Sequence, residues 1–360
     1  YIESTPVYKS VKDYGHLNLD NRLKKFYLDM AKQNIIFPTP YTHQAEAIQL
    51  VLGPEKKSVV VTTGTGSGKT ETFLLPILGR LAREASHPSF QKRAMRSMIL
   101  YPMNALVNDQ LGRLRNLFGH KETVNWFVDK SGRAAKFGRY TGKTLYAGNK
   151  REGASHGEKL ASIKQFYIDR LKQSQEDEKE AELMQILQEK GKWPAKHDLL
   201  SWWGRDGQHW INRTLEHEKD AELLIRSEIQ KAPPDILVTN YSMLEYMLLR
   251  PIERDIFTKT MQYFKYCQQQ GLDEKFILIL DEAHQIRHPS TRINAKIMEL
   301  RDLQPHAKML LLTATPFINS PLDVSSLLAA AAADWSLLNY IGLPTQQHYA
   351  RLLMNMDENR

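Results

Sequence analysis

Five short apolar runs, three of them followed by a stretch with helical periodicity, dominate the hydrophobic pattern of the 360-residue chain. The runs are rich in Val, Ile and Leu and apolar on both faces, which is typical of parallel strands covered by helices on both sides. They occupy residues 58–63, 97–102, 235–240, 276–281 and 308–315. Apolar residues recur at helical spacing after the first three runs, at 69–84, 104–118 and 241–250. The pattern therefore predicts an open α/β sheet with right-handed crossovers.

Residues 146–232 break this alternation. They contain no convincing strand, while long charged stretches such as "EDEKEAELMQILQEKGK" predict helices. We therefore expect a helical insertion, and also a helical tail that Ser320 and Pro321 begin as cap and first-turn residue. The expected order is a helical lead-in, the first part of the α/β domain, the insertion, the second part of the α/β domain and the tail: residues 1–34, 35–145, 146–232, 233–320 and 321–360.

The composition is that of a globular protein with a sizeable core, since 42% of the residues are hydrophobic and 25% are charged. A formal net charge of +8 favours an anionic partner such as nucleic acid, although ordinary enzymes often carry a similar surplus. A single cysteine, Cys267, excludes an internal disulfide framework and a cysteine-built zinc site. No apolar run approaches the about 20 residues that cross a bilayer, and no signal-peptide layout is present. We expect a soluble, cytoplasmic protein with no membrane partner.

The stretch "TTGTGSGKTE" at residues 62–71 fits the phosphate-binding P-loop pattern except that Thr63 occupies the first glycine position. It lies between a predicted strand and a predicted helix, as a P-loop must. In such a loop backbone N–H groups converge on phosphates at a helix N-terminus, Lys69 neutralises their charge and Thr70 ligates Mg²⁺. The loop residues that we expect to bind nucleotide are Thr65, Gly66, Ser67, Gly68, Lys69 and Thr70.

The stretch "ILILDEAH" at residues 277–284 delivers two adjacent carboxylates to the end of an apolar strand. Asp281 can hold Mg²⁺, and Glu282 can orient and deprotonate an attacking water. His284 is placed to sense the γ-phosphate. Together with the P-loop, this arrangement predicts ATP and Mg²⁺ as cofactors, with Lys69, Asp281, Glu282 and His284 as catalytic residues and Thr70 and Asp281 as metal ligands.

These stretches, with "LLLTATP" at 310–316, resemble motifs I, II and III of the superfamily two DEAH-box helicases. In that family a non-glycine residue at the first P-loop position is usual, so the resemblance explains Thr63. It implies a RecA-like P-loop NTPase fold with a mainly parallel sheet. Residues 37–48 resemble the Q motif, in which Gln44 would read the adenine edge with Tyr41 or Phe37 near the base. Thr313 and Thr315 would couple the ATP site to nucleic acid.

Three further segments resemble helicase motifs that grip nucleic acid: residues 100–110, 138–144 and 233–250. A motor must hold phosphates without reading bases, a task that suits short polar side chains and backbone amides. For each residue a helix cap or a turn is the competing role. The candidate contacts are Asn104, Asn108, Gln110, Thr141, Thr144, Thr239 and Asn240. The sequences of the last two segments are similar to those of large Lhr-like and MrfA-like DNA helicases. They are also similar to those of helicase subunits of bacterial anti-phage systems such as DrmA and DruE.

Two interpretations of the tryptophans in the insertion stay open. Trp202, Trp203 and Trp210, with Arg205 and Arg213, either form a base-stacking platform or build the small core of the insertion. The insertion is also a candidate docking element for protein partners. Its histidines lack the spacing of a metal site and are expected at the surface: His197, His209 and His217.

The sequence begins at Tyr1 without an initiator methionine and ends at Arg360 soon after its last motif, so we expect part of a longer polypeptide. Helicases of this type close ATP between two RecA-like domains, and no arginine-finger segment of the second domain follows Thr315. We therefore expect an ATP-driven motor domain, acting on single-stranded or duplex nucleic acid, that is nearly inactive alone. A scaffold that binds ATP without turnover and a phosphotransferase are the alternatives.

Overall fold

The computed structural model describes eleven ranges of the chain: residues 8–54, 56–64, 66–145, 157–197, 199, 203–206, 209–214, 216–286, 291–304, 307–316 and 322–332. Several residues named above lie outside these ranges: Thr65, Trp202, Ser320 and Pro321. Within β4 (Trp203–Asp206) and β5 (His209–Thr214) only the backbone is described, so the roles predicted for Trp203, Arg205, His209, Trp210 and Arg213 stay predictions.

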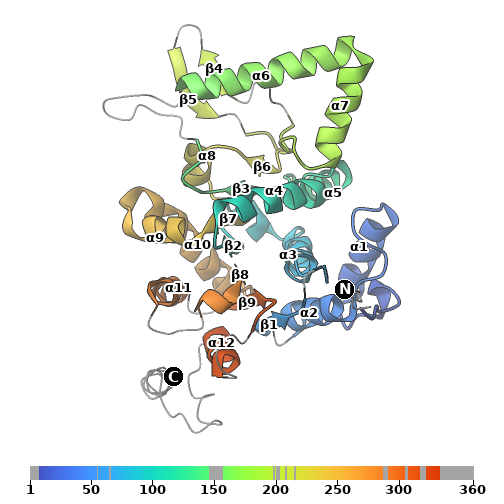
Figure 1. Cartoon of the computed structure of the whole chain (residues 1–360), viewed down its shortest axis with the longest axis vertical. Helices are drawn as coiled ribbons and strands as arrows, with labels where there is room; N and C mark the ends of the chain where they lie inside the picture. The colour runs from blue at the N-terminus through green and yellow to red at the C-terminus, as the bar shows by residue number, and fades with distance from the viewer. Residues whose placement is uncertain are drawn as a thin grey trace, which may run out of the picture. The chain divides into compact units, whose positions relative to one another are not determined.

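Seven strands form one sheet in the order β1-β9-β8-β2-β7-β3-β6 (Figure 1). Their bounds are Val59–Thr62, Lys308–Thr313, Ile277–Asp281, Ser97–Tyr101, Ile236–Asn240, Phe137–Arg139 and Glu222–Leu223, in that order. The pairs β1–β9, β8–β9, β3–β7 and β3–β6 are parallel. All residues of β2 and β7 are buried, as the continuous apolar runs predicted. The predicted RecA-like fold with a mainly parallel sheet is confirmed.

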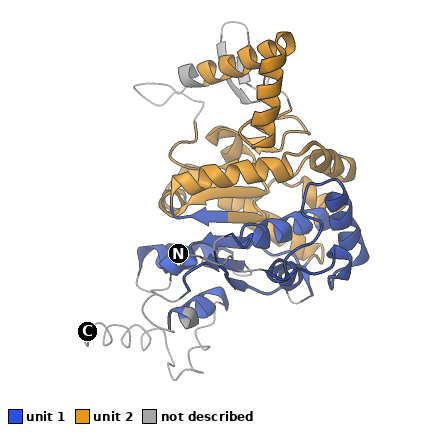
Figure 2. Cartoon of the chain, turned by 45° about the vertical axis from the view of Figure 1, so that its right-hand side comes forward, with its two compact units in different colours: residues 1–83, 99–102, 273–360 blue, residues 84–98, 103–272 orange. Residues whose placement is uncertain are grey.

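The chain divides into two compact units (Figure 2). Unit 1 consists of residues 1–83, 99–102 and 273–360, and unit 2 of residues 84–98 and 103–272. The helices of unit 1 are η1 (Tyr14–His16), α1 (Asn21–Lys32), α2 (Thr42–Leu52), α3 (Glu71–Glu84, whose last residue falls in unit 2), η3 (Ala283–Ile286), α11 (Arg292–Leu303) and α12 (Leu322–Ala332). Those of unit 2 are η2 (Pro88–Gln91), α4 (Asn104–Phe118), α5 (Lys121–Ser131), α6 (Gly157–Glu176), α7 (Glu178–Glu189), α8 (Arg226–Lys231), α9 (Tyr241–Leu249) and α10 (Pro251–Gln269).

The expectation of an insertion without strands is wrong. Its helices α6 and α7 form as predicted, but β4 and β5 pair in an antiparallel ladder, and β6 joins the main sheet beside β3. The sequence pattern does not predict this hairpin because its strands mix charged and aromatic residues, although the Asp-Gly dipeptide at 206–207 favours a tight hairpin turn. β3 and β6 have three and two residues, too few to show a periodicity.

A buried ionic cluster in unit 2 fixes the amino ends of three strands, β2, β3 and β7. Asp235 immediately precedes β7, and its carboxylate accepts hydrogen bonds from Arg96 (2.8 Å), from Arg133 (2.7 and 2.9 Å) and from the backbone N–H of Lys136 (2.7 Å). Arg96 precedes β2 and Lys136 precedes β3. The backbone of Asp235 adds two bonds, since its carbonyl accepts from the N–H groups of Arg96 and Ser97.

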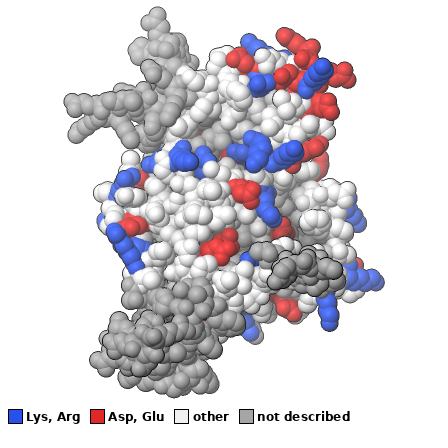
Figure 3. Space-filling model, viewed as in Figure 1, with Lys and Arg blue, Asp and Glu red and all other residues white. Residues whose placement is uncertain are grey.

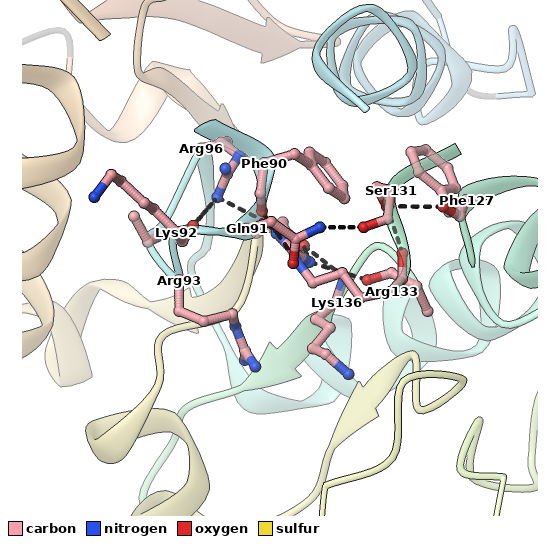
Figure 4. Close-up of polar contacts among 12 residues, drawn as sticks. Phe90, Gln91, Lys92, Arg93, Arg96, Phe127, Ser131, Arg133 and Lys136 are labelled. Carbon is pink, nitrogen blue, oxygen red and sulfur yellow. Dashed lines mark hydrogen bonds and ion pairs between the residues drawn. The ribbon is translucent and has the colours of Figure 1, made fainter. Parts of the chain in front are cut away.

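The guanidinium groups of both arginines in this cluster donate further hydrogen bonds besides those to Asp235. Arg96 also forms a bidentate pair with Glu84, at 2.8 and 2.9 Å, and Arg133 donates to the carbonyl of Phe90. Both guanidinium groups lie over the Phe90 ring, at 5.1 and 4.0 Å from its centroid. Figure 4 shows the Phe90 segment lying against the end of α5, where Ser131 bonds the backbone of Phe127. Burial alone would raise the pKa of Asp235, but the charges of Arg133 and Arg96 outweigh it and hold that pKa below its usual value.

Replacing Asp235 by Asn should cost about 3–5 kcal/mol of unfolding free energy, because it leaves two buried guanidinium groups without their shared counter-charge. The measurement is urea unfolding at pH 7. The folded-state pKa of Asp235 lies below the unfolded value of about 3.9. The carboxylate therefore stabilises the fold fully above about pH 3.9, and this stabilisation is lost as the pH falls from there through the folded-state pKa. The difference between parent and variant should therefore shrink in acid. Asp255→Asn, which breaks an exposed pair with Lys259, is the control and should cost under about 1 kcal/mol; equal losses would contradict the assignment.

Candidate nucleotide-binding site and nucleic-acid contacts

The ends of three strands of unit 1 bring the predicted ATP-site motifs to one edge of the sheet. Thr62, at the end of β1, is opposite Thr313 at the end of β9, and Leu312 is opposite Asp281 at the end of β8. Carboxyl ends of parallel strands are the edge at which α/β sheets bind ligands. The register therefore places the P-loop, DEAH and TAT segments at adjacent positions.

The P-loop is closed by a hydrogen bond between the hydroxyl groups of Thr63 and Ser67, in which Ser67 donates to Thr63 at 2.8 Å. Ser67 is fully buried. Gly66 and Gly68 have φ angles of 78° and 71°, which favour glycine. A Cβ on Gly68 would also lie 2.4 Å from Gln44 Nε2. The threonine at the first P-loop position therefore has a definite structural role, which is to tie the loop's two ends together.

The Q-motif segment supports the P-loop from outside. Gln44, buried in the first turn of α2, donates from Nε2 to the Gly68 carbonyl at 3.1 Å and accepts from the Tyr41 N–H at 2.9 Å. His43 Nε2 lies 2.9 Å from the Ser67 carbonyl, a contact that sequence reasoning missed. Gln44 is thus an organiser of the loop, and its reading of the adenine edge stays a prediction.

Aromatic rings gather beside this segment. The Tyr41 ring stacks on His43, with centroids 5.7 Å apart and planes 16° from parallel, and the Tyr8 ring lies 5.6 Å from Tyr41. Phe37 is 75% exposed. Among the predicted base neighbours, Tyr41 belongs to the aromatic group next to the P-loop, while Phe37 projects into solvent.

The DEAH segment is held by the TAT segment through His284. Its Nδ1 lies 3.2 Å from Glu282 Oε2 and 3.3 Å from Thr313 Oγ1, and the Thr315 N–H donates to the same Thr313 hydroxyl at 3.1 Å. Glu282 has a φ of 53°, a left-handed conformation that is uncommon outside glycine and that clusters at functional sites. The structure therefore joins Glu282, His284, Thr313 and Thr315 in one chain of contacts.

The residues present fit a magnesium site of the nucleotide-dependent kind. Burial, and then the negative charge of Glu282, raise the pKa of Asp281, while Lys69 and His284 act in the opposite direction. Across the described ranges, no cluster of three or more His, Cys, Asp and Glu side chains is arranged to hold a metal ion by itself. Mg²⁺ commonly binds one or two carboxylates together with waters and substrate phosphates. Asp281 and the Thr70 hydroxyl can supply the protein ligands of such a site.

Two of the predicted nucleic-acid contacts meet in unit 2. Asn240 precedes α9 and caps it, accepting from the Met243 N–H at 2.7 Å, while its Nδ2 donates to Asn104 Oδ1 at 2.7 Å. Asn104 is the first residue of α4. The pair brings two helix N-termini together, where backbone N–H groups favour anions such as phosphate.

The predicted threonines of unit 2 are buried and use their hydroxyl groups within the fold. Thr239 donates to the Tyr140 carbonyl at 2.6 Å, and Thr144 donates to the Arg139 carbonyl at 2.8 Å. Thr141 accepts from the Lys143 N–H at 3.3 Å. These hydroxyl groups shape the turn after β3, and direct contact with nucleic acid stays a prediction.

Arg139 extends the polar surface of α4. Its guanidinium donates to the side chain of Asn108, one of the exposed candidates, at 2.5 Å. Gln110 differs from Asn108 in that its side-chain oxygen, Oε1, is buried and accepts no hydrogen bond from the described residues. Sequence reasoning missed Arg139, although an arginine within a nucleic-acid motif is itself a signal for phosphate contact.

The insertion contains a small core, and two of its histidines, His197 and His217, lie at the surface. Met184, Trp193 and Leu199 pack together, with Tyr167 against them. The rings of His197 and His217 stack at 4.4 Å, and both residues are exposed, as expected. Figure 3 shows Asp and Glu side chains gathered where α6 meets α7. In the described part of the chain, no helix is long and apolar enough to span a membrane.

Two family models match this chain. Residues 41–193 match the DEAD/DEAH box helicase family, and residues 192–336 match the SNF2-related domain. The chain resembles the helicase superfamily over these residues. Together the two matched regions include the P-loop, the DEAH segment and the TAT segment.

The Druantia protein DruE of Escherichia coli is 38% identical to this chain over 310 residues, which are 80% of the chain and 16% of DruE. The ATP-dependent RNA helicase DBP7 of Meyerozyma guilliermondii is 30% identical over 117 residues, 32% of the chain and 15% of that protein. The structure of the Mycobacterium smegmatis helicase Lhr, bound to ssDNA and AMP-PNP, has 16% identity and a TM-score of 0.44 over 87% of the chain and 26% of Lhr. The chain therefore spans about one sixth of these curated relatives.

Thr63→Val should weaken ATP binding, because it removes the acceptor for the buried Ser67 hydroxyl while keeping the side-chain shape. A hydrogen bond of this kind contributes about 0.5–1.5 kcal/mol, or up to roughly tenfold in Kd. Thr63→Ser keeps the hydroxyl and should bind ATP like the parent. The measurement is titration with a fluorescent ATP analogue; equal affinity of the Val and Ser variants would show that the loop does not depend on this bond.

Proposed function

We propose that this chain is the ATP-binding motor domain of an ATP-dependent helicase or translocase that acts on DNA. The observation that carries the proposal is the contact of His284 with both Glu282 and Thr313, at the sheet edge where the P-loop also lies. A bare phosphate-binding loop needs no such connection. A motor does, because the state of the nucleotide must reach the segments that move.

The proposed roles follow from the chemistry of each group. Lys69 and the backbone of the P-loop bind the phosphates, and Thr70 and Asp281 hold Mg²⁺. Glu282 orients and deprotonates the attacking water, while His284 passes the state of the γ-phosphate to Thr313. Mg²⁺ supplies charge neutralisation at the transferring phosphoryl group.

The proposed strand contacts lie in unit 2. Asn104 and Asn240 present amides at two helix N-termini, and Asn108 lies one turn farther along α4, where Arg139 at the end of β3 contacts it. Phosphate contacts of this kind position a strand without reading its sequence. The basic balance of the chain, +8, supports an anionic partner.

DNA as the strand rests on the resemblance of residues 138–144 and 233–250 to Lhr-like and MrfA-like DNA helicases, and a place in anti-phage defence rests on the resemblance to DruE. Because the chain spans about one sixth of DruE, we propose that the longer protein supplies a second RecA-like domain. That domain would contribute arginine fingers, which are worth about 10³–10⁵ in rate in related chemistry. The chain alone should therefore bind ATP and hydrolyse almost none, and we place the parent protein in the cytoplasm.

An ATPase assay of the full-length parent protein tests this function. Hydrolysis that single-stranded DNA or RNA stimulates supports the motor, and the stronger of the two strands identifies the substrate. A protein that binds ATP without turnover is a scaffold. Transfer of phosphate to a protein or small-molecule acceptor is the signature of a phosphotransferase, and either of these two results would overturn the proposal.

Glu282→Gln in the full-length protein should keep ATP affinity and lower turnover by roughly 10²–10⁴-fold, the usual contribution of a general base. Lys69→Ala should lower both affinity and turnover, because it removes the cation that neutralises the phosphates. Binding and steady-state hydrolysis are measured on the same preparations. If Glu282→Gln turns over at the parental rate, the base has been assigned to the wrong residue.

Asn104→Asp should weaken strand binding by the chain while leaving the fold intact, because an aspartate oxygen still accepts from Asn240 Nδ2. A new negative charge at about 4 Å from a phosphate costs about 1 kcal/mol in water, roughly fivefold in Kd, and less at high salt. The control is Asn116→Asp, which adds the same charge about 18 Å farther along α4. Fluorescence anisotropy with labelled single-stranded DNA gives both affinities, and similar losses for the two variants would count against the Asn104 contact.

A further inference from the structure

Three large apolar side chains are exposed at the corner where α9 meets α10. Tyr246, Leu249 and Ile252 are 51%, 54% and 53% exposed, whereas their neighbours Met247 and Leu248 are buried in the core. The two helices lie side by side (Figure 1). A cluster of exposed apolar residues on a folded domain is typical of a binding surface.

Two arginines give this corner a cationic character. The Arg250 guanidinium lies over the Tyr246 ring, 4.8 Å from its centroid, and its side chain is 48% exposed. Arg254 is also exposed, and the buried Glu253 offsets part of this charge, since its Oε1 lies 3.8 Å from Arg250 Nη1. An aromatic ring paired with a guanidinium plane is the side-chain set on which unpaired nucleic-acid bases stack.

The corner is continuous with the proposed phosphate contacts. Asn240 caps α9 and holds Asn104, and Tyr246 lies six residues farther along the same helix, about 9 Å by the helical rise. A strand whose phosphates contact the Asn240–Asn104 pair can therefore reach the Tyr246 ring if it runs along α9. Exposed apolar surface and positive charge next to a phosphate site favour nucleic acid over a protein helix, for which the apolar residues alone would suffice.

We propose that Tyr246 and Arg250 form a stacking platform for a base of single-stranded nucleic acid, with Leu249 and Ile252 bordering it. This inference rests on the proposed function and refines it, because it assigns an unpaired strand, and not a closed duplex, to this surface. A base in a duplex is already stacked and cannot turn its face to the ring. Stacking accepts every base, since each has an aromatic face, so the platform is compatible with a motor that must pass any sequence.

The experiment compares two labelled oligonucleotides of the same length with the chain as it stands, by fluorescence anisotropy at low salt. One is oligo(dT), and the other has the same sugar–phosphate backbone without bases. The platform predicts that oligo(dT) binds more tightly, by about 5- to 150-fold for one stacked base. Tyr246→Ala should remove most of this difference and leave the affinity for the abasic strand unchanged, and Tyr246→Phe should restore the difference.

Tyr266 offers a matched control, because it also carries a cation over its ring, Lys92 at 4.2 Å, and lies in the same α10 that follows the corner. Tyr266→Ala should leave both affinities unchanged. Equal binding of the two oligonucleotides by the parent chain overturns the platform but leaves the phosphate contacts standing. Equal losses for both oligonucleotides in Tyr246→Ala, or no change for either, also overturn it. Failure of the chain to bind either oligonucleotide overturns the proposed function together with the platform.

Discussion

The carboxylate of Asp235 is the interaction on which the arrangement of unit 2 depends. It is fully buried and accepts hydrogen bonds from Arg96, from Arg133 and from the backbone of Lys136. Arg96 immediately precedes β2, and Arg133 and Lys136 lie in the segment that leads into β3. A buried ionic group of this kind adds little net stability compared with apolar packing, but losing one partner is costly. Its effect is therefore on geometry: a shift of one residue in β7 would withdraw the carboxylate from both guanidinium groups.

The functional residues of unit 2 lie at the opposite ends of the same strands. β7 ends at Asn240, β3 leads into the turn that contains Thr141 and Thr144, and α4 starts at Asn104 three residues after β2 ends. Fixing the amino ends of short parallel strands fixes their carboxyl ends as well, because each strand has only three to five residues in which to deviate. The 2.7 Å bond between Asn240 and Asn104 is possible only when β7 and the start of α4 keep this register. The position of the Asn240–Asn104 pair at the carboxyl ends of the strands thus depends on the Asp235 cluster at their amino ends.

Much of this architecture was readable in the sequence, since local signals and the tertiary structure agree. The helix expected at 104–118 is observed as Asn104–Phe118, and the five apolar runs all became strands. The short strands β3 and β6 were missed because pairing with a neighbour defines them, and no periodicity of their own does. The contact of His43 with the Ser67 carbonyl and that of Arg139 with Asn108 join residues 24 and 31 positions apart, so only the folded chain reveals them. For the threonines 141, 144 and 239 the residue type fitted both a turn and a phosphate contact, and burial decides where their hydroxyl groups point.

Insensitivity to sequence imposes a common requirement on every group proposed to touch the strand. Base edges differ in their donors and acceptors, so side chains that hydrogen-bond to edges would make the motor pause at particular sequences. Phosphates and base faces are the two features that all nucleotides share. The amides of Asn104 and Asn240 suit the first feature, and the ring of Tyr246 with its guanidinium neighbour suits the second. Because Asn240 caps α9 and Tyr246 lies on it, a displacement of this single helix would move one member of each set together.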